Sequence, residues 1–321
     1  MKWLFVAVLL HCVQAVCAWG FYAHKKINHY AVFLLPPEMM VLYKQHINYL
    51  AEHAVDPDKR RYAVREEGPR HYIDMDRYGS YPFRELPRKW EDAVKKFPAD
   101  TLMQHGIVPW WIQQMLQRLT KAFREKDQQK ILKLSAEIGH YIADAHVPLH
   151  ACSNHNGQLT GQVGIHGFWE SRIPELLAEK EWDFLIGKAE YLSAPLQFTW
   201  QRVLESAVAA DTVLREEKAL SAIFPADGRF AFEERNNVVV KQYSVAYTLA
   251  YNQRLRNMVE RRMRQSVFGV ASFWYTAWVN AGQPDLKTLR NTPFSETEAK
   301  EIELLNMEWR KGAIRGREHE D

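Results

Sequence analysis

Residues 139–150 read GHYIADAHVPLH, and residues 166–170 read HGFWE. Each stretch holds a histidine and an acidic residue four positions apart, namely His140 with Asp144 and His166 with Glu170. On a helix, such residues project from one face with their Cβ atoms about 5–6 Å apart, so both side chains can bind one metal ion. Imidazole nitrogen and carboxylate oxygen are ligands that suit zinc. The two stretches therefore predict helices that carry metal ligands.

A proline separates the two pairs. Pro148 ends or kinks the helix before it, so His150 is expected to turn toward a second metal ion. One pair of this kind arises easily by chance in a chain with 13 histidines. Two pairs with His150 between them favour a metal site. His146, on the other side of Pro148, is expected to be a buried, hydrogen-bonded histidine without a ligand role.

Helical periodicity covers most of the chain, and strand-like alternation is scarce. The pattern predicts helices over residues 24–34, 37–52, 110–125, 128–144, 166–179 and 199–214, two more between 237 and 280, and one that starts at Ser295 with Glu298 at its capping-box position. Polar and small residues interrupt the apolar face with Val267, Val270, Trp274 and Trp278, which favours core packing over a membrane anchor. The predicted fold is all-α, as a single multi-helical domain without linkers or repeats.

The first 18 residues resemble a secretory signal peptide. Lys2 precedes an apolar run from Trp3 to Leu10, and a small-residue tail ends at Ala18. We expect a signal peptide over 1–18, a domain over 19–321 with about the last 12 residues as a disordered tail, and a secreted or periplasmic location. Loss of Lys2 changes the formal charge balance from 42 − 39 to 41 − 39, or +2, which is too small to identify a nucleic-acid partner.

Cleavage after Ala18 would expose the α-amine of Trp19, which lies near His24 in the sequence. This amino-terminal tryptophan, followed by the histidine and carboxylate motifs, resembles the zinc-dependent phospholipase C and single-strand-specific nuclease superfamily over residues 19–175. The resemblance implies an all-α fold with three zinc ions. It assigns the first ion to Asp56, His71, His140 and Asp144, the second to His150, His166 and Glu170, and the third to His24 and the amine and carbonyl of Trp19, with Asp144 as a bridge.

The reaction implied by this resemblance is phosphodiester hydrolysis. Three divalent ions carry more charge than the carboxylates of Asp56, Asp144 and Glu170 neutralise, and the resulting cationic pocket suits a phosphate group. Paired zinc ions lower the pKa of bound water and orient it for in-line attack. Asp56 is also expected to assist this chemistry. Two further catalytic roles are expected, with alternatives open: Asp74 as an orienting acid or a helix cap, and Lys59, or the adjacent Arg60, as the phosphate clamp.

Two substrates remain open, and we favour a phospholipase-C-like phosphodiesterase over a nuclease. Three features favour a phospholipid head group. The last ligand is a glutamate, the gap between His150 and His166 is short, and Cys152, alone after signal cleavage, cannot form an intrachain disulfide. The five-residue step from Trp19 to His24 favours single-stranded nucleic acid, and thus an endonuclease or nucleotidase. A non-catalytic, zinc-stabilised binding protein is a third possibility. After signal cleavage we expect no transmembrane segment, and the sequence implies no obligate protein partner.

Overall fold

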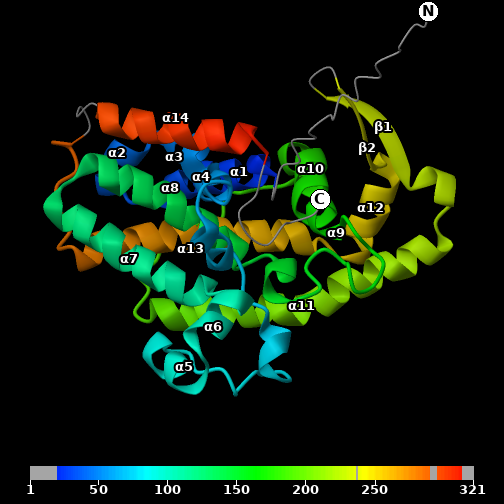
Figure 1. Ribbon diagram of the computed structural model, residues 1–321. Coiled ribbons are helices and arrows are strands. Elements are labelled where there is room, and N and C mark those ends of the chain that lie inside the picture. Colours follow the sequence, from blue (N-terminus) through cyan, green and yellow to red (C-terminus); the bar gives the residue numbers. More distant parts are fainter. Residues whose placement is uncertain (1–19, 236–237, 290–294, 313–321) are drawn as a thin grey trace, which may run out of the picture.

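The computed structural model describes residues 20–235, 238–289 and 295–312, and helices dominate these residues (Figure 1). The first α-helices are α1 (Phe21–Ala31), α2 (Pro37–Tyr43), α3 (Ile47–Glu52), α4 (Asp56–Arg60), α5 (Trp90–Lys96), α6 (Ala99–His105), α7 (Val108–Glu125) and α8 (Gln128–Asp144). The later ones are α9 (Ile165–Gly167), α10 (Ile173–Glu181), α11 (Pro195–Ile223), α12 (Val245–Arg254), α13 (Met258–Asn280) and α14 (Glu296–Arg310).

Short turns and one hairpin complete the chain. The 3-10 turns are η1 (Val32–Leu34), η2 (His53–Val55), η3 (Arg65–Arg70), η4 (Met75–Tyr78), η5 (Pro148–Ala151) and η7 (Ala226–Gly228), and η6 (Phe168–Arg172) is a π-helical turn. Strands β1 (Phe230–Arg235) and β2 (Val238–Tyr243) pair antiparallel, with Phe230 opposite Tyr243. They lie at one end of the helical body (Figure 1). The all-α prediction is confirmed, with this small sheet as an addition.

Several predicted helix bounds differ from the structure. The helix predicted over 37–52 is divided into α2 and α3, and the one predicted over 199–214 is part of the longer α11. The helical prediction from residue 237 was wrong at its start, because β2 occupies 238–243 and α12 begins only at Val245. Some predictions fall outside the described residues. They concern the signal peptide, Trp19, the end of the expected tail and the side chain of Glu298.

Helix α13 forms the centre of the core. It packs against α1, α7 and α8, and Val267, Val270 and Trp274 are fully buried. Trp274 also donates its indole N–H to the carbonyl of Ser135 in α8 (2.9 Å). The predicted core role of this apolar face is confirmed. Among the described residues, no helix is both long and apolar enough to cross a membrane.

Helices α1 and α8 approach each other closely. Asn28 of α1 donates its side-chain N–H groups to the carbonyls of Leu50 and Ala136, each at 3.0 Å. A Cβ atom at Gly139 of α8 would lie 2.0 Å from Oδ1 of Asn28, so this position needs glycine. One residue beyond Gly139, the ring of His140 stacks on His24 with a centroid distance of 3.8 Å.

Helix α8 ends at Asp144, the second residue of its ligand pair. Asp127 caps its start by accepting the backbone N–H of Lys130 (3.1 Å), and the helix stops at Asp144. Val147 is extended because the ring of the following Pro148 disfavours helical backbone there. The chain then turns through η5, which moves His150 off the axis of α8 as predicted from the proline.

Candidate metal centre

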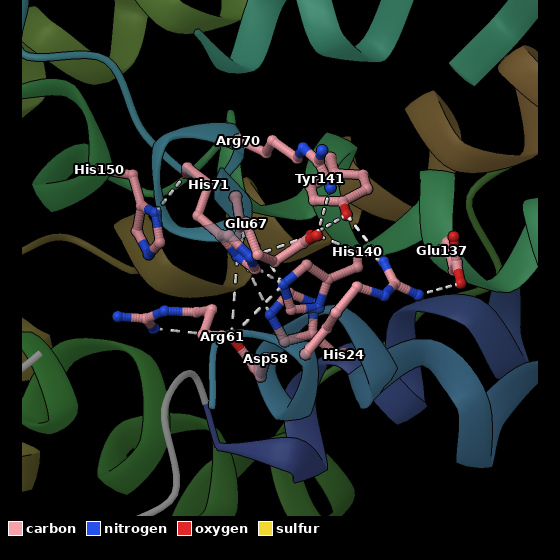
Figure 2. A network of polar contacts seen from close by, with 12 residues as sticks. His24, Asp58, Arg61, Glu67, Arg70, His71, Glu137, His140, Tyr141 and His150 are labelled. Atoms are coloured by element: carbon pink, nitrogen blue, oxygen red, sulfur yellow. Dashed lines mark hydrogen bonds and ion pairs between the residues drawn. The ribbon is translucent and has the colours of Figure 1, made fainter. Parts of the chain in front are cut away.

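Four side chains converge at the end of α8, and we call Asp58, His71, His140 and Asp144 the first cluster. Nε2 of His140 lies 3.3 Å from Oδ2 of Asp144 and 3.0 Å from Nδ1 of His71. Nδ1 of His71 lies 3.0 Å from the same Asp144 oxygen. Oδ1 of Asp58, from α4, lies 3.5 Å from Nε2 of His140. All four residues are buried, and Figure 2 shows Asp58, His71 and His140 directed toward one another.

His150, His166 and Glu170 form the second cluster. Nε2 of His166 lies 2.9 Å from Oε2 of Glu170 and 3.2 Å from Nε2 of His150. Nε2 of His150 lies 3.5 Å from the same Glu170 oxygen. These residues come from η5, α9 and the π-helical turn η6, and all three are buried.

Backbone carbonyls orient three of the imidazole rings. Nδ1 of His140 donates to the carbonyl of Ala54 (2.9 Å), Nδ1 of His150 to that of His71 (2.6 Å), and Nδ1 of His166 to that of His155 (3.0 Å). These bonds assign the proton to Nδ1, so in the neutral ring Nε2 carries a lone pair. Two such lone pairs and a carboxylate meet in the second cluster. A shared cation satisfies all three groups, so the donor set fits zinc.

Acid–base properties of the ligands agree with cation binding. Burial raises the pKa of Asp144, but His140 and His150 outweigh it and hold the pKa well below its usual range. Burial lowers the pKa of His140, yet Asp144 and Asp58 raise it to about 9, so zinc must displace a proton there. Burial raises the pKa of Glu170 to about 7 despite the neighbouring His150, and a bound cation would favour its ionised form.

His24 joins the first cluster from another side. Its Nε2 lies 3.4 Å from Oδ1 of Asp144, whereas His71 and His140 face Oδ2 of the same carboxylate. His24, Asp58 and His140 also have ligand atoms within 4.8 Å of one another. Trp19 lies just before the described residues. The backbone N–H of the next residue, Gly20, donates to Oγ of Ser171 (2.9 Å), one residue after Glu170.

The structure brings together seven of the nine predicted ligands, and Asp56 is not among them. Oδ2 of Asp56 lies 2.6 Å from Nδ1 of His53, and its Oδ1 lies 3.4 Å from Nζ of Lys59. Burial raises the pKa of Asp56, but these two neighbours hold it below its ordinary value. Asp58 lies in the first cluster instead. Residues two apart on a helix point in nearly opposite directions, so α4 can aim only one of these carboxylates at the site.

The predicted catalytic side chains have other partners. Lys59 pairs with Asp56, and Arg60 donates to Glu137. Asp74 faces His105, with 3.9 Å between Oδ2 and Nδ1, and it belongs to none of the metal-ligand groups found among the described residues.

Arg61, and not the expected Lys59 or Arg60, is the cation beside the first cluster. It is buried, and its Nη1 lies 3.9 Å from Oδ1 of Asp58 (Figure 2). The sequence signal for it is the i,i+3 spacing from Asp58 to Arg61.

His146 is a buried histidine outside both clusters. It is 0% exposed, and its Nδ1 donates to the carbonyl of Ile142 (2.7 Å). Burial and the neighbouring Arg262 lower its pKa well below the usual value. It therefore acts as a neutral core residue, as expected from its position before Pro148.

This all-α fold, with buried histidine and carboxylate clusters, defines a helical protein built to bind metal ions. The profile of the zinc dependent phospholipase C family matches residues 23–211, more than half of the 321 residues, and the chain belongs to that family. It is therefore a zinc-dependent, phospholipase-C-like hydrolase of phosphoester bonds. No curated protein matches the sequence at a significant level.

Proposed function

We propose that this chain is a secreted or periplasmic phosphodiesterase that binds three zinc ions and cleaves the head group from a phospholipid. The observation that carries the proposal is the direct link between the two clusters. Nδ1 of His150, a second-cluster residue, donates to the backbone carbonyl of His71, a first-cluster residue (2.6 Å). The backbone N–H of Ile73 returns a bond to the carbonyl of His150 (2.9 Å). Clusters joined in this way suit ions that act on one phosphate group.

The positions of the carboxylate oxygens support three ions rather than two. Oδ2 of Asp144 faces His71 and His140, while its Oδ1 faces His24. A carboxylate with each oxygen toward a different imidazole set can bridge two ions. We assign the first ion to the first cluster, with Asp58 in the role expected for Asp56. The second ion belongs to the second cluster, and the third to His24, Asp144 and the amine and carbonyl of Trp19.

The chain contributes a proton acceptor and a phosphate contact. Bound zinc would supply Lewis acidity and an activated water. Oδ2 of Asp58 is buried and has no hydrogen-bond partner among the described residues, so it can accept a proton from the attacking water. Arg61, beside Asp58, can donate to the phosphate oxygens with its planar guanidinium.

Arg61 also favours a second candidate function. With Asp58 as the ligand, an arginine three residues later matches the phosphate-clamping arginine that nuclease relatives tend to carry. The alternative is thus an endonuclease or nucleotidase that prefers single strands. The family match supports the phospholipid as substrate, and we retain it as the main proposal.

A test compares substrates on one metal-analysed sample. Elemental analysis of the purified, signal-processed protein should find three zinc ions, and a chelator should abolish hydrolysis of bis(p-nitrophenyl) phosphate. Phosphatidylcholine in mixed micelles should be cleaved faster than single-stranded DNA at equal zinc content. Faster cleavage of DNA would favour the nuclease. Bound zinc without any turnover would show a binding protein, and at most one tightly held zinc in active enzyme would exclude the three-ion centre.

A further inference from the structure

His71 binds its cluster with a different ring nitrogen from the other imidazoles of the two clusters. His140, His150 and His166 direct Nε2 at their clusters and donate Nδ1–H to backbone carbonyls. His71 directs Nδ1 at the first cluster, 3.0 Å from Oδ2 of Asp144 and 3.0 Å from Nε2 of His140. A neutral ring that binds a cation through Nδ1 carries its proton on Nε2. His71 therefore needs an acceptor on its far side.

Glu67 provides that acceptor. Its Oε1 lies 3.6 Å from Nε2 of His71, which is buried and makes no hydrogen bond to the residues that the structure describes. This separation exceeds a hydrogen bond, and such contacts in unliganded sites commonly tighten when the ligand binds. The Glu67 side chain is 0% exposed, so its carboxylate has no access to solvent.

Surrounding donors hold the Glu67 carboxylate in place. Arg70 donates to Oε2 (2.5 Å) and the hydroxyl of Tyr141 donates to Oε1 (Figure 2). Nη1 of Arg60 lies 3.5 Å from Oε2. Arg70 is itself stacked on the ring of Trp111, 4.0 Å from its centroid. These three groups hold the Glu67 carboxylate in place. Its Oε1 is also directed at Nε2 of His71.

We propose that Glu67 is a positioning residue that accepts the Nε2 proton of His71 and thereby fixes the tautomer that directs Nδ1 at the metal. The inference rests on the proposed zinc centre and adds to it. A carboxylate acceptor raises the basicity of an imidazole ligand more than a neutral carbonyl does, so His71 should be the strongest of the imidazole ligands. Glu67 itself touches neither the metal nor the substrate.

The variant Glu67→Gln tests the role through zinc affinity, measured by chelator competition on folded protein. Glu137→Gln is the matched control. Glu137 is also buried and accepts a hydrogen bond from Arg60, but this bond is to Arg60 and not to His71. Glu67→Gln should weaken zinc binding at the first cluster, which contains His71, about 10–100-fold, and Glu137→Gln should leave it unchanged. Equal affinity in Glu67→Gln and wild type, or equal losses in both variants, would overturn the inference.

A second measurement needs no variant and stays decisive if Glu67→Gln does not fold. The ¹⁵N chemical shifts of the His71 ring in zinc-loaded wild-type protein report which nitrogen carries the proton. A proton on Nε2 supports the inference, and a proton on Nδ1 overturns it. Wild-type protein that takes up no zinc would overturn both this inference and the proposed centre, whereas tight zinc binding with a proton on Nδ1 would overturn only the role of Glu67.

Discussion

At the scale of single residues, the position of Arg61 has the clearest chemical consequence. A guanidinium that is only 4% exposed has lost most of its hydration, and its Nη1 lies 3.9 Å from Oδ1 of Asp58. When Asp58 binds a cation, less of its charge is available to Arg61. A phosphate oxygen would then be the natural partner for the guanidinium, which offers a planar fork of donors.

We therefore expect Arg61→Ala to reduce phosphodiesterase turnover about 100-fold, the usual scale for loss of one fixed donor to a developing charge. Zinc content should not change. Lys59→Ala is the matched control, because Lys59 pairs with Asp56 outside the clusters, and its rate should stay close to that of wild type. Steady-state kinetics with elemental analysis of each variant measures this. Similar losses in the two variants would show that Arg61 has no special role.

The histidine ligands could be predicted from the sequence and the aspartate of α4 could not. The i,i+4 pairs on α8 and at His166 could be recognised, because helical spacing alone puts both side chains on one face. Helix α4 spans only Asp56 to Arg60, which is too short for periodicity to show which carboxylate faces inward. Its orientation is decided by tertiary contacts such as the pair of Asp56 with His53, and these are not visible in the sequence.

At the scale of elements, the close approach of α1 and α8 determines where His24 lies. Gly139 leaves no room for a side chain against Asn28, so a larger residue has to displace the Asn28 side chain or the helix that carries it. His24 and Asp144 are on these two helices, 3.4 Å apart. We therefore expect the spacing of these helices to affect the proposed third ion.

Gly139→Ala should destabilise the fold by about 1–3 kcal/mol, as overpacking of a tight core does, and should lower the zinc content toward two ions. Gly269→Ala on α13 is the control. Its added Cβ would meet Ile142 at 3.3 Å and His146 at 3.4 Å, a tight fit without overlap. Denaturant unfolding and zinc analysis compare the two. A control that is as unstable as Gly139→Ala would argue against the overlap with Asn28 as the cause.

The β-hairpin shows where helical periodicity misleads. Residues 238–240 are three consecutive valines, and β-branched side chains favour strands. We read this segment as the start of a helix because the following residues have a helical pattern. Its strand conformation depends on pairing with β1, where Phe230 lies opposite Tyr243, and on stacking of Tyr243 against Phe168 at 3.7 Å. The sequence pattern does not show this pairing and stacking, because both form only in the folded chain.

At the scale of the whole molecule, chain processing should control the third ion. If the α-amine of Trp19 is a ligand, protein made in the cytoplasm with methionine retained before Trp19 should lack that ion and most of its activity, with the helical fold preserved. Zinc content and phosphodiesterase rate of the processed and extended forms, matched by circular dichroism, check this. Identical stoichiometry and rate would show that the amino terminus is not a ligand.

The distribution of ligands along the chain has a consequence for how such a protein can evolve. Every metal-ligand group found among the described residues lies between His24 and Glu170, while α11, α12 and α13 lie beyond this interval and pack on the body. Substitutions in the later part that keep an apolar face need not disturb the chemistry. The family profile also ends at residue 211, within α11, so α12 and α13 lie beyond the matched residues.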